Sequence, residues 1–451
     1  GVDLGTVRMQ AGPRVAGLYM QRSFQGDRRL GDRRQDVFNF SPAVSAGVLY
    51  YFDQGRHFSA GIVGRAGTGG GASVGSVKHA LAAYHTAVMA VLGICLGSLF
   101  WVMLFHILNA KWPITIRRQM EHVMRAMWVV MILFLPLLII EILAGGLLFK
   151  WMNPEVTAGD AIYEHKAAYL NVPFFVIRAV MYFGIWLFLI SRFWAWQREQ
   201  DATGDRWISS NARFMSAPGL IFYALSVAFA GFDWLMTLDF HFFSTMWGVY
   251  FFAGAAYSAM ALNILMTSLL KAAGKLEGVV TEEHLHDQGK LLFGFTCFWA
   301  YIAFSQYFLI WYSNIPEETR YFDFRQESFP IATMTLVIGH FVLPFIFLLP
   351  RPLKRIQGYV AFFAGCALAL HLLDMWWVIR PMADAAKMKA AALDGEVAYP
   401  KGIEAAWVDL AASVGVLSIF AAVVVRNVFS SNLVPVNDPR LGECLHHKNY
   451  V

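Results

Sequence analysis

Four charged residues interrupt long apolar stretches of this chain. Glu141, Arg178, Asp233 and Asp374 each lie inside a different run of hydrophobic residues. A charge at the centre of a bilayer costs about 2.5–3.5 kcal/mol even on lenient insertion scales. Several such residues at one depth therefore predict a polar chamber inside a membrane, suited to protons or to a redox substrate.

A proton relay is the chemistry that these residue types favour. His371 lies three positions before Asp374, so the two side chains share one face of a helix. A carboxylate beside a histidine orients the ring and favours its charged form. We take Glu141, Arg178, Asp233, His371 and Asp374 as the candidate relay, with Arg178 keeping a carboxylate ionised. The alternative is that Glu141 and Arg178 form a structural ion pair and that His371 is an ordinary buried histidine.

Three further residues are candidate contacts for a quinone. Gln306 and Tyr307 can hydrogen-bond a quinone carbonyl, and His340 lies at a comparable depth. His340 and His371 on successive spans also admit a b-type haem, although a second histidine pair and glycine-lined clefts are lacking. The inner half of the membrane has little comparable, apart from His106 and Asn263.

The cysteines point to no metal centre in this chain. Four cysteines stand far apart without a C-x-x-C motif, so iron–sulfur clusters and covalently attached haem are not expected here. The tail segment 442–447 holds one cysteine and two adjacent histidines without the spacing of a zinc site, and we expect a solvated tail. Metal ligands are therefore predicted to be absent.

The elements that carry these residues are membrane spans. The chain has 451 residues, of which 57% are hydrophobic and 15% charged, whereas soluble domains carry about 25% charged residues. Nine apolar stretches are each long enough to cross the hydrocarbon core of about 30 Å. They are 84–109, 126–149, 170–195, 215–238, 243–270, 290–313, 330–350, 356–379 and 405–427. The sequence therefore predicts an all-α polytopic membrane protein with nine to ten transmembrane helices.

Lysine and arginine set the orientation. The loops 111–125, 192–213, 271–290 and 351–355, with the tail 426–451, hold 17 of them, against 8 in the alternate loops. The positive-inside rule places the first set and the C-terminus in the cytoplasm. Since the basic residues lie in these short loops, the net charge of +5 does not suggest nucleic-acid binding.

The first 83 residues form a basic and glycine-rich arm. Seven arginines fall within residues 1–35, and a Gly-rich linker covers 61–76. Either a weak tenth span crosses the membrane near 37–65 or the whole arm is exported.

Motifs along most of the chain carry a family resemblance. They are Tyr169-Leu-Asn-Val-Pro-Phe-Phe-Val-Ile-Arg178, Phe232-Asp-Trp-Leu-Met-Thr-Leu-Asp239, Phe304-Ser-Gln-Tyr-Phe308, Trp311-Tyr-Ser-Asn-Ile-Pro-Glu-Glu318 and the tail 435–446. In this order and at these separations they resemble the polysulfide-reductase (NrfD-like) membrane family, and within it the ActF-type subunits of bacterial alternative complex III. The resemblance covers roughly 80–451, and residues 1–80 do not match the regular first span of the family.

The resemblance implies a fold and an assembly. It implies two four-helix bundles, 84–238 and 243–380, plus flanking helices, with 381–451 supplying the last span and the tail. It implies a subunit of a quinol:cytochrome c, or quinol:oxidase, oxidoreductase of the bacterial inner membrane. The implied partners are a second NrfD-like subunit, an iron–sulfur subunit, c-type cytochrome subunits and a terminal oxidase. Iron–sulfur clusters and haem c would belong to those partners.

The role of this chain within such an assembly is left open by the resemblance. In the family the quinol site lies in the outer half of the first bundle, the depth of the predicted chamber. The membrane subunit that contacts the iron–sulfur clusters is the stronger candidate for that site. For this chain three roles are left open: quinol oxidation, proton movement or a structural role. Rival functions are a secondary transporter and a purely structural anchor. A transporter is usually built from inverted repeats with broken helices, which the sequence does not display.

Overall fold

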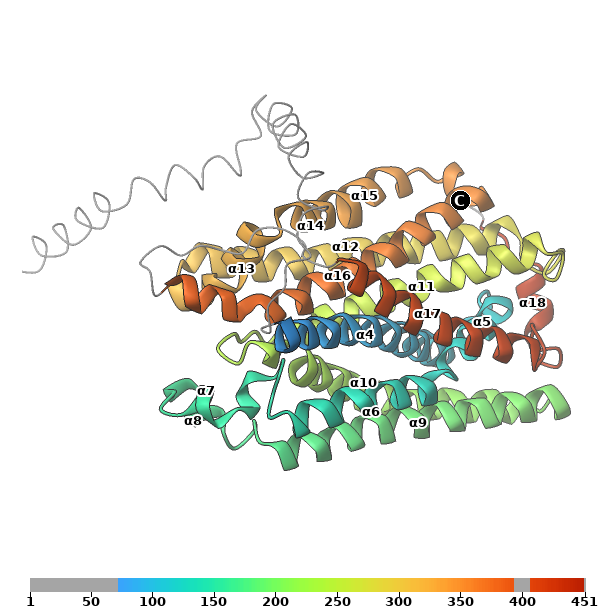
Figure 1. Ribbon diagram of the computed structural model, residues 1–451. Coiled ribbons are helices and arrows are strands. Elements are labelled where there is room, and N and C mark those ends of the chain that lie inside the picture. Colours follow the sequence, from blue (N-terminus) through green and yellow to red (C-terminus); the bar gives the residue numbers. More distant parts are fainter. Residues whose placement is uncertain (1–71, 393–405, 450–451) are drawn as a thin grey trace, which may run out of the picture. The chain divides into compact units, whose positions relative to one another are not determined.

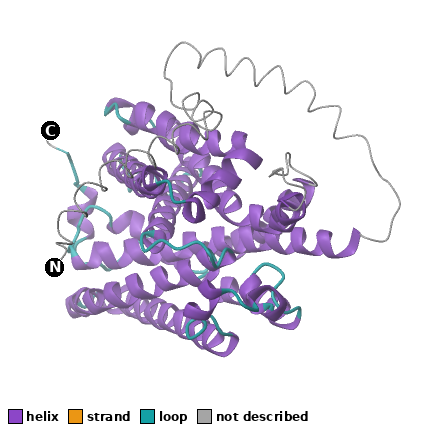
Figure 2. Cartoon of the chain, turned by 90° about the vertical axis from the view of Figure 1, so that its left-hand side faces the viewer, coloured by secondary structure: helices purple, strands orange, loops and turns teal. Residues whose placement is uncertain are grey.

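A computed structural model describes residues 72–392 and 406–449 of the chain. Within these residues every regular element is a helix, as the purple ribbons and teal connections of Figure 2 show. They belong to one compact unit, 71–451. The all-α fold class predicted from the sequence is confirmed.

Nine helical segments in the described part are long and apolar enough to cross a membrane. They match the nine predicted spans one by one, with bounds Val77–Ile107, Ile114–Leu143, Val172–Thr203, Arg206–Leu238, Trp247–Ala272, Glu282–Ser313, Pro330–Leu348, Gln357–Ala383 and Ala406–Phe429. The tenth span near 37–65 lies outside the described residues.

The long helices run side by side in Figure 1. They are α4 (Ala72–Ile107), α6 (Met127–Leu143), α9 (Val172–Thr203), α10 (Arg206–Trp234), α11 (Trp247–Ala272), α12 (Glu282–Ser313), α16 (Gln357–Ala392) and α17 (Ala406–Phe429). The seventh span is composite, with α14 (Pro330–Thr335), a π-helix η3 (Leu336–Val342) and α15 (Leu343–Leu348) in succession. Shorter elements join them: α5 (Ile114–Met124), η1 (Lys150–Met152), α7 (Pro154–Thr157), α8 (Ala161–Lys166), η2 (Met236–Leu238), α13 (Pro316–Ser328), η4 (Pro352–Arg355) and α18 (Leu441–Leu445).

Two predicted boundaries are wrong. The segment 111–125, predicted as a loop, contains the wholly buried helix α5, which continues almost directly into α6. The first span begins well before 84, so the end of the predicted Gly-rich linker, 72–76, is helical. In both cases the predicted span stops short because the neighbouring residues are polar. In α5 these polar residues are nevertheless buried against other helices.

Local sequence signals account for the start of α9 and for the turn that joins it to α10. Asn171 caps α9 by accepting a hydrogen bond from the Phe174 amide, and Asp205 caps α10 through the Trp207 amide. Gly204 ends α9 with φ of +68°, a left-handed conformation that glycine adopts without steric cost. This tight connection sets α9 and α10 against one another.

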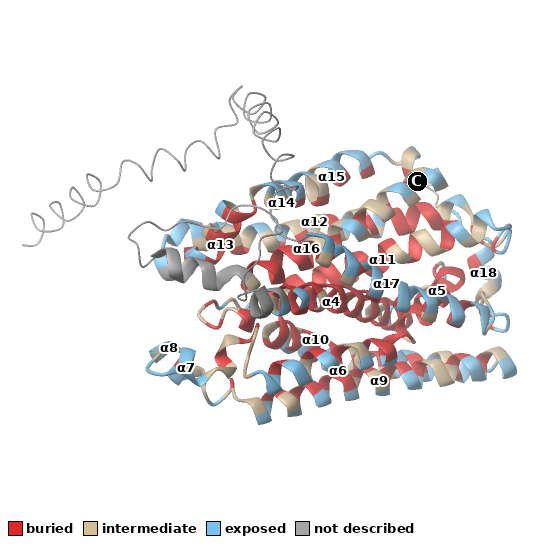
Figure 3. Ribbon diagram, in the orientation of Figure 1, coloured by how far each residue is buried: buried red, intermediate tan, exposed pale blue. Residues whose placement is uncertain are grey.

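Helix α4 lies at the centre of the described unit. It packs against α10 and α6 of the first predicted bundle and against α11 and α16 of the second, and Figure 3 shows most of its described part, from Leu81 onward, as buried. The closest approach is at Gly97, where an added Cβ would lie 1.9 Å from the carbonyl oxygen of Ala255 on α11. Inside a membrane no hydrophobic driving force brings helices together, so they commonly pack through small residues that let their backbones approach closely. The division into two four-helix bundles stays a prediction.

Candidate functional site

Arg178 on α9 and Asp233 on α10 form a buried ion pair that two hydrogen bonds hold together. Arg178 Nε lies 2.7 Å from Asp233 Oδ2, and the second guanidinium nitrogen lies 2.8 Å from Oδ1. The Tyr182 hydroxyl donates to Oδ2 at 2.8 Å, and Arg178 also donates to the Tyr169 carbonyl at 2.9 Å. The guanidinium stacks on the Tyr169 ring, 3.8 Å from its centroid. Asp233 is therefore a fully compensated carboxylate.

Glu141 does not pair with Arg178, so that alternative is wrong. Its carboxylate accepts hydrogen bonds from the backbone amides of Leu148, at 3.0 and 3.1 Å, and Phe149, at 3.2 Å. The chain turns back through Gly145 and Gly146, whose φ values of +66° and +84° bring these amides toward the end of α6. Glu141 thus holds the turn after its own helix, a contact that helix depth alone could not reveal.

A second polar group, the Asp374 cluster, comprises Tyr250, Trp299, His340, His371 and Asp374. The Tyr250 hydroxyl on α11 donates to Asp374 Oδ1, and the Trp299 indole on α12 donates to Oδ2 at 3.1 Å. Asp374 is fully buried, and its side chain has no lysine or arginine partner among the described residues. Its hydrogen bonds come from neutral donors alone, in contrast to those of Asp233.

The two histidines complete the Asp374 cluster. An added Cβ at Gly254 would lie 3.6 Å from His371 Nδ1 and 3.8 Å from Asp374 Oδ2, so both side chains contact this one glycine of α11. His371 Nε2 lies 3.3 Å from the Ala90 carbonyl on α4. The His340 ring, carried by the π-helix, stacks on Trp299 with centroids 3.8 Å apart. Single π-helical turns are frequent at functional sites.

The histidines have unused hydrogen-bonding atoms. Both ring nitrogens of His340 and Nδ1 of His371 are buried and lack a hydrogen-bond partner in the described part of the chain. The ring nitrogens of buried His85, His106 and His122 share this feature, so the Asp374 carboxyl group is what distinguishes the cluster. The cluster therefore combines one charge-uncompensated carboxyl group with open nitrogen atoms, a combination that can take up and pass on a proton.

Each of the three predicted quinone contacts has protein neighbours of its own. The Gln306 amide accepts from Ser244 Oγ at 2.8 Å and donates to the Ile302 carbonyl at 3.3 Å, so both of its polar atoms are engaged. Tyr307 packs edge-on against Phe322, with centroids 5.4 Å apart, while His340 belongs to the Asp374 cluster. Among the described residues no hydrogen bond or ring contact joins these three side chains, and the quinone site stays a prediction.

The sequence analysis missed an aspartate–histidine contact between two connecting segments. His241 Nε2 lies 2.7 Å from Asp160 Oδ2, and its Nδ1 lies 3.7 Å from Asp239 Oδ1. Asp239 and Asp160 both raise the pKa of His241. This contact ties the start of α8 to the segment that leads into α11.

A buried arginine was also missed in the predicted loop 314–329, which forms α13. Arg325 donates to the backbone carbonyls of Trp377 at 3.1 Å, Tyr321 at 2.9 Å and Val378 at 2.7 Å. Burial lowers the pKa of this guanidinium. A basic residue in a polar segment reads as solvated from sequence, so only the structure could place it inside.

The opposite ends of the helices also bury charge, contrary to the expectation that the inner half holds little beyond His106 and Asn263. On α5, Arg117 pairs with Glu121 at 2.8 Å and with Asp438 of the tail at 3.4 Å, and Arg118 pairs with Asp201 at 2.7 Å. Burial alone would raise the pKa of Asp438, but Arg440 and Arg117 lower it to about 2.

The described tail, 435–449, is docked, so the expectation of a solvated tail is wrong. Cys444 is buried, and its thiol donates to the Trp112 carbonyl at 2.9 Å and lies 3.4 Å from His284 Nε2. His447 Nε2 lies 2.7 Å from Asp287 Oδ2. Within 72–392 and 406–449, no group of three or more His, Cys, Asp or Glu side chains is placed to hold a metal ion.

Comparison of the chain with protein-family models and with curated proteins finds no match.

Proposed function

We propose that this chain is a membrane subunit of a quinol:cytochrome c, or quinol:oxidase, oxidoreductase, of the ActF type found in bacterial alternative complex III. Nine membrane-length helices and the ordered motifs support the proposal. The proposed location is the bacterial inner membrane, with the C-terminus in the cytoplasm. The proposed partners are a second NrfD-like subunit and the iron–sulfur and c-type cytochrome subunits.

Within that assembly we propose proton transfer as the role of the chain. The observation that carries the proposal is the Asp374 cluster, in which a buried carboxyl group without a cationic partner adjoins histidines with open nitrogens. Quinol oxidation releases protons together with electrons, so a membrane subunit beside the reaction needs groups that accept protons and move them. Asp374 and His371 are the proposed carriers, with the Tyr250 hydroxyl positioning the carboxyl group.

The residues of the first predicted bundle receive a different assignment. Asp233 is held by Arg178 and Tyr182, and Glu141 by backbone amides, so both carboxylates serve the packing of their helices. Quinol would supply the electrons and protons of the reaction. Because both polar atoms of Gln306 are engaged and His340 stacks on Trp299, we propose that the quinol site lies on a partner subunit.

Purification under mild conditions tests membership of the assembly. The chain, solubilised in detergent and captured through an affinity tag, is expected to bring down multi-haem and iron–sulfur subunits together with quinol:cytochrome c activity. Haem staining, optical spectra and activity are recorded on the same sample. A lone, colourless and inactive protein would contradict the proposal and favour a transporter, and a b-type spectrum in the isolated chain would favour the haem alternative.

A further inference from the structure

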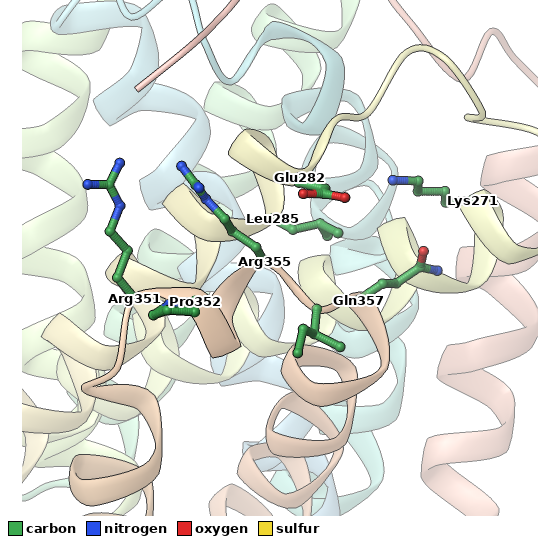
Figure 4. A pocket seen from close by; sticks show the side chains of 8 residues that line it. Lys271, Glu282, Leu285, Arg351, Pro352, Arg355 and Gln357 are labelled. Carbon is green, nitrogen blue, oxygen red and sulfur yellow. The ribbon is translucent and has the colours of Figure 1, made fainter. Parts of the chain in front are cut away.

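A pocket of about 540 Å³ opens at the ends of four membrane-length segments, away from the Asp374 cluster. Its lining includes Lys271 at the end of α11, Glu282 at the start of α12, Arg351 and Arg355 at η4, and Gln357 at the start of α16. Figure 4 shows the Arg351 and Arg355 side chains on one side of the pocket and those of Lys271 and Glu282 on the other. The pocket is large enough for the head group of a lipid.

Positive charge dominates the lining of this pocket. Three cations, Lys271, Arg351 and Arg355, stand against one lining carboxylate, that of Glu282. Arg355 is partly neutralised by Glu283, 2.6 Å away, but neither Lys271 nor Arg351 has an ion-pair partner within the described residues. The Nε atoms of Arg351 and Arg355 are buried without hydrogen-bond partners there. These donors require an acceptor that the described side chains do not provide.

The position of the pocket identifies the source of that acceptor. Each lining segment begins or ends a membrane-length helix, so the pocket lies at the depth of phospholipid head groups. Apolar surface adjoins it, because Ile356 in the lining is 54% exposed and Leu349 is 57% exposed. The positive-inside distribution puts this end at the cytoplasmic leaflet, where anionic lipids are abundant and basic pockets between helices bind them.

We infer that this pocket binds the phosphate-bearing head group of an anionic glycerophospholipid. The guanidinium groups of Arg351 and Arg355 and the Lys271 ammonium hold the phosphate oxygens, since charge-assisted hydrogen bonds to phosphate are among the strongest in proteins. The first acyl carbons lie over Ile356. A free phosphate ion shares the polar chemistry but gains nothing from this apolar surface.

Native mass spectrometry of the full-length, delipidated protein tests the inference. Phosphatidylglycerol is expected to bind at least tenfold more tightly than phosphatidylcholine, and the double variant Lys271→Gln/Arg351→Gln is expected to lose that preference. The control Arg213→Gln removes an exposed arginine outside the lining and is expected to keep it. Equal binding of the two lipids, or an unchanged preference in the double variant, would overturn the inference.

Two further arms separate the sources of phosphate and guard against misfolding. Inorganic phosphate, titrated against bound phosphatidylglycerol, is expected not to displace it, and displacement at equimolar concentration would assign the pocket to a free anion instead. Glu282→Gln removes the one lining carboxylate and is expected to tighten phosphatidylglycerol binding. Weaker or unchanged binding in this variant would contradict the electrostatic argument even if the double variant failed to fold.

Discussion

At the scale of single residues, Asp233 and Asp374 are both buried carboxyl groups, but their hydrogen-bond partners differ. Asp233 receives two hydrogen bonds from Arg178 and one from Tyr182. Asp374 receives hydrogen bonds only from Tyr250 and Trp299, which carry no charge. A carboxylate paired with a buried guanidinium is costly to separate from its partner, whereas a carboxyl group held by neutral donors alone has no counterion to lose. We therefore propose a stabilising role for Asp233 and proton transfer for Asp374.

The variant Asp233→Asn should destabilise the protein. It leaves the Arg178 guanidinium buried without its counterion, which costs about 3–5 kcal/mol. Thermal unfolding of the detergent-solubilised protein measures the loss. The double variant Arg178→Met/Asp233→Leu should regain most of it, because an apolar pair carries no uncompensated charge. A stable Asp233→Asn protein with lost proton release would instead return Asp233 to the relay.

Residue types and depth predicted which polar side chains are buried among the helices, but not which of them contact one another. The sequence identified Arg178, Asp233, His371 and Asp374, since charges in apolar runs are visible in one dimension. It could not pair Arg178 with Asp233, because partners on different helices depend on how each helix is rotated about its own axis. The same limit hid Tyr250 and Trp299, which read as ordinary aromatic core residues.

At the scale of elements, the contact between α4 and α11 depends on the absence of a side chain at Gly97. Replacement by alanine would put a Cβ 1.9 Å from a backbone oxygen, so the helices must separate. We expect Gly97→Ala to destabilise the protein by about 1–3 kcal/mol, measured by thermal unfolding.

The matched control for that contact is Gly184→Ala on α9. An added Cβ there meets no heavy atom within 4 Å. Alanine is the better helix former, so this variant should be neutral or more stable by up to about 1 kcal/mol. Equal effects of the two substitutions would show that close packing of α4 on α11 does not govern stability.

The Asp160–His241–Asp239 contact should loosen as the pH rises. The pKa of His241 is raised by its carboxylate partners, so its stabilising charge is fully present below about pH 6.5, its unfolded value, and is lost as the pH passes the folded pKa. Amide hydrogen exchange around α8 is measured in wild type and in a His241→Gln variant. Between neutral and alkaline pH, exchange should accelerate more in wild type than in the variant, which lacks the ionisable ring. An identical pH dependence in wild type and variant would contradict the ion pair.

Element boundaries were predicted well where hydrophobicity decides them and poorly where buried charge does. Helix α5 carries Arg117, Arg118 and Glu121, all buried in an ion-pair network that includes tail residue Asp438. In a sequence, charged residues of this kind are taken to mark the end of a membrane span. Their burial depends on a partner more than 300 positions away, which local hydropathy cannot register.

At the scale of the whole molecule, the proposed orientation puts the docked tail and the lipid pocket on the cytoplasmic side and the His241 contact outside. Cysteine labelling tests this topology. Lys448 and Glu164 are exposed, so cysteines introduced at these positions can react. Glu164→Cys should react with a membrane-impermeant maleimide in intact spheroplasts, and Lys448→Cys only after permeabilisation. The parent protein is the control, and the reverse pattern would invert the proposed orientation.

The measurement that tests the central claim most directly is quinol-driven proton release by the intact assembly in proteoliposomes. The variant Asp374→Asn should release protons, and therefore oxidise quinol, more slowly than wild type, because two protons must leave for every quinol oxidised. Ser258→Ala, which removes a buried hydroxyl bonded only to the Ala255 carbonyl of its own helix α11, should match wild type. An unchanged rate of quinol-driven proton release in a folded, assembled Asp374→Asn complex would contradict the assignment of this cluster to proton transfer.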